Sequence, residues 1–293
     1  MGFLARLFGK KPAARELLEA KAKPLPASPP SSSTTPRRPA PPDHVRPDAP
    51  TGFQPPEPAG RPLAVLSALR VVVEVVGEAY YDRASWDVMN SEAGFYTDEG
   101  AERTFSPGSA DGIALVPAPR NPFDKNAVAV FVRRHHIGYL PADLAQVWCR
   151  TIKAACEQGY MVTVQGRIWA RSRGGGRVST RVTLSLPESG SLWPANAYPD
   201  GDFGILSGDY LRKVTQASRH QDALIAWTGK DLLVELRDID GRLNALIDGI
   251  PVGPLTKASH DTLAPRVATT QPTYVGGIVR PTGTTSVALE VRA

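Results

Sequence analysis

The sequence is poor in cysteine: its 293 residues contain only Cys149 and Cys156. They are seven positions apart in a stretch predicted to be helical, and a rise of ~1.5 Å per residue separates them by about 10 Å. That separation is too large for a disulfide bond. Two thiols also fall short of the four ligands of a usual structural zinc site. We therefore expect free thiols and a reducing, cytoplasmic location.

Long apolar runs are missing as well. No stretch approaches the ~20 apolar residues that a membrane-spanning helix needs, and no apolar segment near the start precedes a small-residue cleavage site. We therefore do not expect export by the usual signal-peptide route. Apolar residues still make up 42% of the chain, which is enough for an ordinary core, and the length suits about two domains.

Recognisable catalytic motifs are also lacking. The glycines Gly174–Gly176 are not followed by the Lys-Ser/Thr of a phosphate-binding loop, and no Gly-x-Ser-x-Gly elbow occurs. The acidic residues are scattered and do not form the paired cluster of a two-metal nuclease. We predict no enzymatic activity, no cofactor and no metal site, and a nuclease is the weakest of the hypotheses that we consider.

The net charge of +5 comes entirely from the amino-terminal part of the chain. Residues 1–62 carry 10 Lys/Arg and 5 Asp/Glu, whereas residues 63–293 carry 24 of each sign. A neutral folded part argues against sequence-blind binding to duplex DNA, which relies on many phosphate contacts. Recognition of a short segment or of a strand end stays open.

Residues 1–23 form a short basic amphipathic segment, with Phe3, Leu4, Leu7 and Phe8 on one helical face. Such a segment could contact an anionic membrane or a partner, or it could be a frayed terminus. Residues 24–62 contain 14 of the 28 prolines. We predict a disordered Pro-rich linker there, either a spacer or a ligand for a Pro-binding domain.

A first β-rich domain is predicted over residues 63–190. The segment 82–111 lacks a sustained period and is predicted to be a loop with a helical turn around Ala84–Met89. β-Branched runs predict strands. A helix is predicted between Pro141, expected at its N1 position, and Gly159, with Val147 among the residues on its inner side. The predicted elements are strands Arg70–Gly77, Ile113–Val116, Ala127–Val132, Tyr160–Ala170 and Val178–Leu186 and the helix Ala142–Glu157.

A polar turn, Asn121–Asn126, lies between two of these strands. Pro122 fixes its own φ and favours an extended Asn121. The side chains of Asn121 and Asp124 can accept hydrogen bonds from nearby backbone amides and stiffen the turn. The turn could be a simple connector, or a preformed recognition element that presents Phe123.

Three blocks carry a family resemblance: Tyr80-Tyr81, the run Leu115–Val130, and Ile137–Pro141 followed by a helix. Together they resemble a HIRAN domain over about residues 69–186. The resemblance implies a small OB-like β-barrel that captures the 3′-hydroxyl end of single-stranded DNA. It also implies the residues of the end-binding groove, which are Tyr80, Tyr81, Asn121, Phe123 and Asp124, with Tyr139 nearby.

Each of these residues also has a purely structural explanation. In a pair at a strand end, one of Tyr80 and Tyr81 points inward, so packing competes with base stacking. Asp124 could accept a hydrogen bond from a terminal sugar hydroxyl, or it could only cap the turn, and Asn121 has the same two roles. Phe123 could contact a ligand or fill the space between the strands.

A basic hairpin follows the helix. One predicted strand has long side chains at every second position, which therefore share a face: Arg167, Trp169, Arg171 and Arg173. This face could contact phosphates and stack a base, or it could be a solvated outer surface. We include Arg167 and Trp169 among the candidate nucleic-acid-binding residues.

The second half repeats the order of the first over residues 200–293. Three of its segments correspond in order to the strands around the polar turn: Leu232–Leu236, Asp240–Asp248 and Ile250–Leu255. A helix over Lys257–Arg266 and two more strands follow, Thr273–Arg280 and Ser286–Arg292. Before them, Asp209–Ala217 is predicted to be a helix and Ala223–Trp227 a strand. This half lacks an Asn-Pro-aromatic-Asp turn. We therefore predict a degenerate copy that has a packing or scaffolding role and does not bind DNA ends.

The fold expected is therefore mainly β: two tandem small OB-like barrels, each with one helix, behind a disordered tail. The leading functional hypothesis is a non-enzymatic module that binds single-stranded DNA at its 3′ end. The alternative is a protein-interaction or membrane-tethered adaptor that does not bind nucleic acid.

Overall fold

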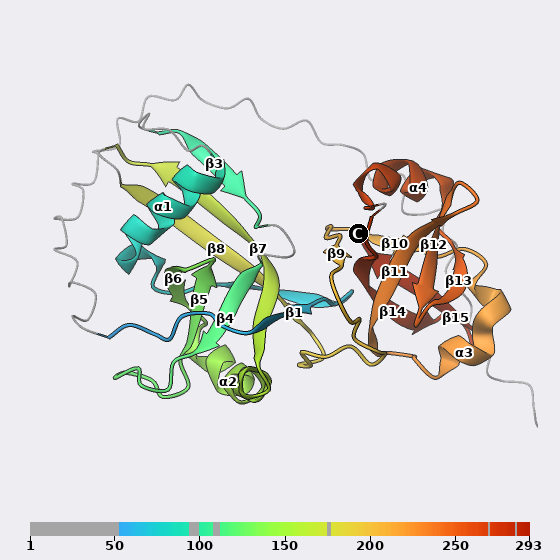
Figure 1. The fold of residues 1–293 in the computed structure, drawn as a ribbon, viewed down its shortest axis with the longest axis horizontal. Helices are drawn as coiled ribbons and strands as arrows, with labels where there is room; N and C mark the ends of the chain where they lie inside the picture. The colour runs from blue at the N-terminus through green and yellow to red at the C-terminus, as the bar shows by residue number, and fades with distance from the viewer. Residues whose placement is uncertain (1–52, 94–99, 108–111, 175–176, 269, 285) are drawn as a thin grey trace, which may run out of the picture. The chain divides into compact units, whose positions relative to one another are not determined.

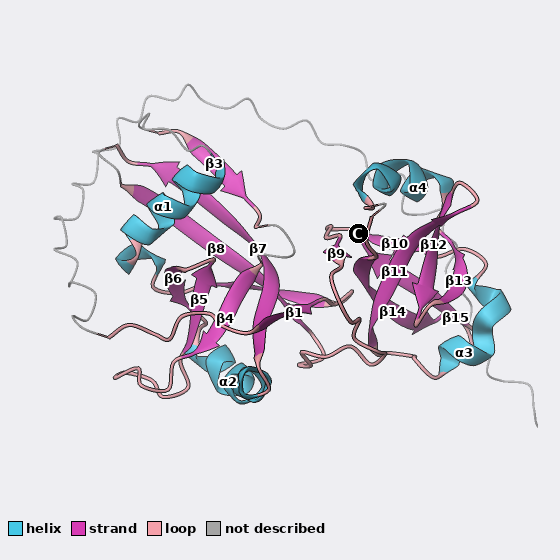
Figure 2. Cartoon of the chain, viewed as in Figure 1, coloured by secondary structure: helices cyan, strands magenta, loops and turns pink. Residues whose placement is uncertain are grey.

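The computed structural model describes residues 53–93, 100–107, 112–174, 177–268, 270–284 and 286–293. The predicted amphipathic segment 1–23 and most of the predicted linker 24–62 lie outside these residues. In the described part strands predominate (Figure 2), and the mainly β fold expected is confirmed. None of the described helices is long and apolar enough to span a bilayer.

The first half contains a sheet of eight strands and two α-helices (Figure 1). Its strands are β1 (Arg61–Val65), β2 (Arg70–Glu74), β3 (Glu102–Phe105), β4 (Ile113–Pro117), β5 (Val128–Val132), β6 (His135–Tyr139), β7 (Tyr160–Ser172) and β8 (Val178–Pro187). Its helices are the 3-10 turn η1 (Glu78–Tyr80), α1 (Asp82–Ala93) and α2 (Ala142–Glu157).

The strand path of this sheet curls back on itself. Its order is β2-β8-β7-β4-β5-β6, with β1 and β3 also paired to β7. The two ends of the path meet at a bridge between Val76 and Tyr139, whose amides each donate to the other residue's carbonyl oxygen at 2.9 Å. The bridge brings the end of β2 next to β6, and it places η1 beside the β5–β6 hairpin.

Strands β4 and β5 are buried on both faces, which explains their unbroken apolar sequence. Ile113, Leu115 and Val130 point into the main core. The alternate residues, such as Ala114 and Phe131, belong to a second apolar cluster on the other face. The strands predicted over Ile113–Val116 and Ala127–Val132 are confirmed to within one residue at each end.

Helix α2 covers Ala142–Glu157, as predicted, and buries Ala145, Trp148 and Ile152. Its end is also as predicted, since Gly159 has a φ of +83°. Two details were wrong. Pro141 is the N-cap residue and not the first helical residue, and Val147, expected on the inner side, is exposed.

Helix α1 contains the predicted helical turn around Ala84–Met89, but the helix is longer than that turn, and strand β3 also lies within the predicted loop over residues 82–111. The polar composition of α1 conceals a short buried stripe of Ser85, Val88 and Met89, with Met89 fully buried. The stripe has the i, i+3, i+4 spacing of a helix, but it spans little more than one turn. The expectation of one helix per barrel is therefore also wrong for this half.

The second half contains a sheet of seven strands with its own apolar cluster. Its strands are β9 (Gly204–Ile205), β10 (Leu211–Lys213), β11 (Asp231–Ile239), β12 (Arg242–Ile247), β13 (Ile250–Pro254), β14 (Thr273–Pro281) and β15 (Val287–Arg292). Its helices are η2 (Ala217–His220), α3 (Gln221–Ile225), α4 (Lys257–Leu263) and η3 (Ala264–Arg266). Both sheets belong to one compact unit, Pro47–Ala293.

Two predictions for this half named the wrong type of element. The predicted helix Asp209–Ala217 contains strand β10, and the predicted strand Ala223–Trp227 is largely helix α3. Both segments are short, so partners far along the chain decide their structure. Strand β10 pairs with β15, and Gln221 at the start of α3 both donates to and accepts from the backbone of Val287.

The second sheet has the strand order β10-β15-β14-β11-β12-β13, which follows the first sheet position by position. Further details recur. Strand β9 pairs parallel to β14, as β1 does to β7, and a bridge between Val214 and Leu255 joins the ends of the path. Register shifts interrupt β12–β13 and β5–β6 alike.

Candidate functional site

The Asn121–Asn126 turn connects β4 and β5 and is held by its own side chains. The Asn121 Oδ1 atom accepts from the amides of Phe123 and Asp124, at 2.9 and 3.4 Å. The Asp124 Oδ1 atom accepts from the Asn126 amide at 2.8 Å. These bonds confirm the predicted stiffening of the turn. They leave Phe123 77% exposed, so the alternative in which it fills space between strands is wrong.

Beside this turn lies an aromatic cluster formed by Tyr81, His136 and Tyr139. The rings of Tyr81 and His136 are 4.2 Å apart between centroids, and those of His136 and Tyr139 are 4.7 Å apart. The Tyr139 side chain is hydrogen-bonded to the side chains of both Tyr81 and Asn121. Tyr81, Tyr139 and the polar turn, predicted from separate parts of the sequence, are therefore brought together.

Tyr80 and Tyr81 differ in environment, as expected for adjacent residues. Tyr80 is 47% exposed at the end of η1, whereas Tyr81 is half-buried against His136 and Tyr139. Gly77, with a φ of +83°, precedes η1 and allows the chain to leave the sheet at this point. Tyr80 thus offers an open ring face, and Tyr81 offers a hydroxyl fixed by packing.

The polar groups of the cluster are neutral at physiological pH. Burial raises the pKa of Tyr81 and of Tyr139. Burial lowers the pKa of His136 to about 4, although its Nε2 atom lies 2.9 Å from the Gly138 carbonyl oxygen, an acceptor that opposes the shift. The cluster therefore offers hydroxyl, amide and ring surfaces to a ligand, while Asp124 at the turn adds a carboxylate.

His136 was not predicted as a site residue. It is instead half-buried at the centre of the cluster, and its ring is also 5.1 Å from that of Phe131. The register shift between Val130 and Phe131 sets which way this part of the β5–β6 hairpin faces. A bulge of this kind leaves little mark on the sequence, and so the position was missed.

The buried imidazole predicts a pH-dependent stability. Because the folded pKa of about 4 lies below the ordinary value of roughly 6.5, the unfolded chain binds this proton first as the pH falls. The stability that depends on neutral His136 is present above about pH 6.5 and is lost towards pH 4, by about 1–3 kcal/mol. Urea unfolding at pH 7.5 and 4.5 should show a smaller pH effect in His136→Asn. An equal loss in both proteins would contradict this assignment.

Arg167 and Trp169 lie on a different surface, the outward face of the β7–β8 hairpin. Along β7 they alternate with buried Ile168 and Ala170, which confirms that they share a face. Trp169 is opposite Arg181 on β8, and Arg167 forms an ion pair with Asp209. The structure thus does not bring these two residues together with the polar turn and the aromatic cluster.

The first half is therefore a curled β-sheet of the small barrel type, with a rigid turn and an aromatic cluster at one end of the strand path. The family model of the HIRAN domain matches residues 69–187, as the resemblance predicted. Among solved structures, the crystal structure of the HIRAN domain of human HLTF is similar at 18% identity. The match covers 43% of this chain and 82% of that one, with a TM-score of 0.22. No curated protein matches the chain.

Proposed function

We propose that the HIRAN-like segment is a non-enzymatic module that binds the 3′ end of single-stranded DNA. The observation that carries the proposal is the exposed Phe123 on a hydrogen-bonded turn, next to the Tyr81–Tyr139–Asn121 cluster. Exposed aromatic rings stack on unpaired bases. A fixed set of hydroxyl, amide and carboxylate groups suits the single sugar that ends a strand.

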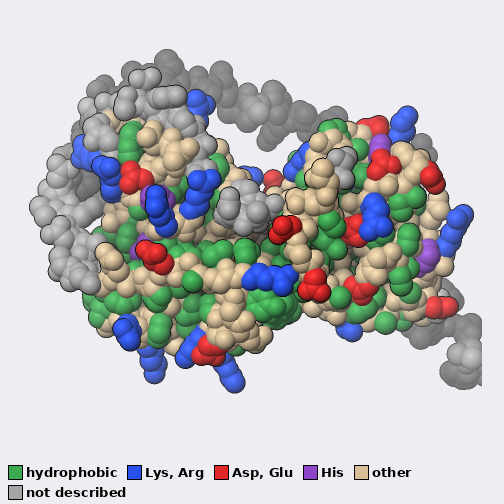
Figure 3. Space-filling model, in the orientation of Figure 1, with side chains coloured by type: hydrophobic (Ala, Val, Ile, Leu, Met, Phe, Trp, Pro, Cys, Tyr) green, Lys and Arg blue, Asp and Glu red, His purple; other side chains and the backbone are tan. Residues whose placement is uncertain are grey.

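The charge distribution supports recognition of a short segment. Lys/Arg and Asp/Glu side chains are interspersed over the face that Figure 3 shows, in keeping with the equal numbers of both signs in residues 63–293. Binding that depends on stacking and directed hydrogen bonds needs few phosphate contacts. We therefore expect the salt dependence to be shallow.

Asp124 is the residue that would distinguish an end from an internal nucleotide. A carboxylate has about four acceptor sites, so it can cap the turn through Asn126 and still accept from a terminal sugar hydroxyl. An internal phosphodiester has no such donor. Fluorescence anisotropy with oligonucleotides bearing a free or a blocked 3′-hydroxyl is expected to show about tenfold tighter binding of the free end.

The variants of this experiment separate recognition from turn structure. Asp124→Ala should remove the preference for the free hydroxyl. Asp124→Asn retains an oxygen that can accept from Asn126, but it loses the charge and should weaken the preference. Asp222→Ala, at an exposed position in the first turn of α3, is the matched control. Equal binding of free and blocked ends by the unsubstituted protein would reject the proposal.

We further propose that the second sheet is a diverged copy of the first that does not bind ends. The matching strand order supports a duplication. At the position of the polar turn, β11 and β12 are joined only by Asp240 and Gly241, both at positive φ, which is a tight hairpin turn. Such a turn has no room for an aromatic residue flanked by capping side chains.

A further inference from the structure

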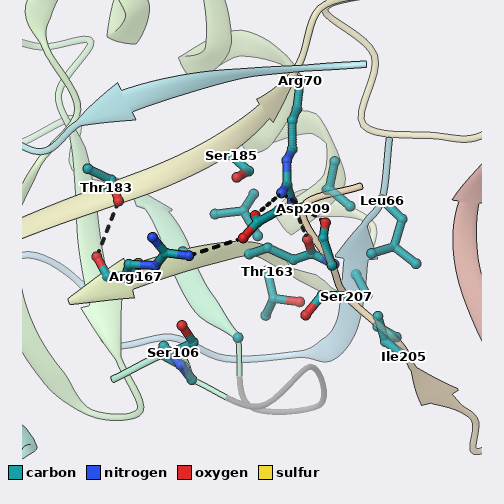
Figure 4. Close-up of a pocket in the computed structure, with 18 of the residues that line it drawn as sticks. Leu66, Arg70, Ser106, Thr163, Arg167, Thr183, Ser185, Ile205, Ser207 and Asp209 are labelled. Carbon is teal, nitrogen blue, oxygen red and sulfur yellow. Dashed lines mark hydrogen bonds and ion pairs between the residues drawn. The ribbon is translucent and has the colours of Figure 1, made fainter. Parts of the chain in front are cut away.

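A second candidate binding site is a polar pocket of about 380 Å³ (Figure 4). Strands β1, β2, β7 and β8 form one side of it, and the segment from Ile205 to Asp209 forms another. Three arginines line it, Arg70, Arg167 and Arg266. Hydroxyl groups from Thr183, Ser185 and other residues lie around them.

One carboxylate, that of Asp209, joins two of the arginines. Its Oδ1 atom lies 2.8 Å from an amino nitrogen of Arg70, and its Oδ2 atom lies 3.3 Å from one of Arg167. The Asp209 side chain is 65% exposed, whereas the Arg70 side chain is only 14% exposed. The anion is thus the accessible member of the group, and Arg70 is the enclosed one.

Arg70 is held in place independently of this ion pair. Its guanidinium donates to Gln165 Oε1 at 2.8 Å and to the Gly208 carbonyl at 3.0 Å. Arg292 adds further positive charge close by, and it donates to the Asp209 carbonyl at 2.8 Å. Burial, followed by the charge of Arg292, lowers the pKa of Arg70. Among the residues that line the pocket, one carboxylate side chain therefore faces three arginines.

The backbone that carries Asp209 is also fixed. A Cβ atom at Gly208 would lie 2.0 Å from the Ala293 carbonyl carbon, so the chain passes closely at this point. The amide of Ala293 donates to the Tyr210 carbonyl at 3.1 Å. The Asp209 side chain can therefore leave the arginines by a change of rotamer, while the backbone around it stays in place.

We propose that this pocket binds a phosphate group, which takes the place of the Asp209 carboxylate between Arg70 and Arg167. Guanidinium groups pair with phosphate oxygens in the same fork geometry as with carboxylate oxygens. The Ser185 hydroxyl, which lines the pocket, donates to a remaining oxygen, whereas the Thr183 hydroxyl already donates to the Arg167 carbonyl. The phosphate belongs either to a nucleic-acid strand or to a free phosphate-bearing molecule, and the chemistry of recognition is the same for both.

The test is isothermal titration of the full chain at low ionic strength with two probes, pyrophosphate and a ten-nucleotide single strand. Asp209→Asn keeps the side-chain shape and removes the competing charge. It is expected to tighten pyrophosphate binding by about two- to fivefold, the range of a partly exposed ion pair. Arg167→Gln is expected to weaken pyrophosphate binding by about fivefold or more.

Arg181→Gln is the matched control. Arg181 forms an ion pair with Glu74 on the same sheet face, at similar exposure, but it does not line the pocket. Tighter binding of both probes by Asp209→Asn identifies a strand phosphate, and tighter binding of pyrophosphate alone identifies a free one. Unchanged or weaker pyrophosphate binding by Asp209→Asn, or no detectable binding at all, overturns the proposal. Because pyrophosphate has no sugar end, the result is independent of the proposed end recognition.

Discussion

Gly138→Ala is expected to destabilise the chain by about 4–7 kcal/mol, the largest loss that we predict for one added methyl group. Gly138 has a φ of +149°, and a Cβ atom there would lie 2.5 Å from Val75 Cγ1 and 2.8 Å from the Val76 carbonyl oxygen. Both contacts are impossible without a shift of the chain after β2. The added methyl group would therefore force Val76 away from Tyr139.

The size of the loss follows from three contributions. The left-handed backbone costs a non-glycine residue about 1–2 kcal/mol. Overpacking adds about 1–3 kcal/mol, and the two hydrogen bonds between Val76 and Tyr139 are each worth about 1 kcal/mol. Because these bonds join the ends of the strand path, their loss would also move Tyr139 away from Tyr81 and Asn121. We expect weaker DNA binding to accompany the loss of stability.

Gly159→Ala provides the control for the backbone term. Gly159 has a φ of +83°, and nothing lies within 4 Å of the position that its Cβ would take. Alanine there should cost only the conformational penalty of about 1–2 kcal/mol. Urea unfolding of both variants measures the difference. If Gly138→Ala is as stable as Gly159→Ala, the bridge at Val76 is not the close contact that the structure describes.

The sequence predicted those elements whose local pattern and tertiary environment agree. The strands around the polar turn are apolar throughout because both faces are covered, and helix α2 has a clear start and stop. The capping by Asn121 and Asp124 could also be predicted, because those bonds are local and depend on residue type. The sequence contained enough information for this part of the site.

Contacts between distant residues could not be predicted in the same way. His136 joins the aromatic cluster through a register shift in its hairpin. The bonds of Asp209 to Arg70 and Arg167 span 139 and 42 positions, and Asp209 was assigned to a helix. For α1, the buried stripe that ends at Met89 was long enough to predict one helical turn but too short to predict the full helix. In each case packing against remote elements decides the outcome, and no local preference indicates it.

Phe123→Ala is expected to weaken binding of single-stranded DNA by roughly five- to a hundredfold, while leaving the fold intact. One stacked base contributes about 1–3 kcal/mol, and the Phe123 ring has the exposure to supply that contact. The same exposure of 77% means that the side chain contributes little to the core. The hydrogen bonds of the turn come from Asn121 and Asp124 and remain in the variant. A loss of affinity without a loss of stability is therefore the signature of a recognition residue.

The chain offers a closely matched control in Tyr210, which is 73% exposed in the second half. Tyr210→Ala removes an exposed aromatic of similar size, and it should leave DNA affinity unchanged if the polar turn is the binding element. Anisotropy with a free 3′-hydroxyl oligonucleotide measures affinity, and urea unfolding checks that both variants keep the stability of the unsubstituted protein.

Equal affinity losses in the two variants would mean that any exposed aromatic ring can bind the DNA. An unaffected Phe123→Ala would exclude the turn from the interface. Only a loss confined to Phe123 supports end recognition by the turn, because Phe123 alone of the two rings stands beside the hydrogen-bonded cluster of Tyr81, Asn121 and Tyr139.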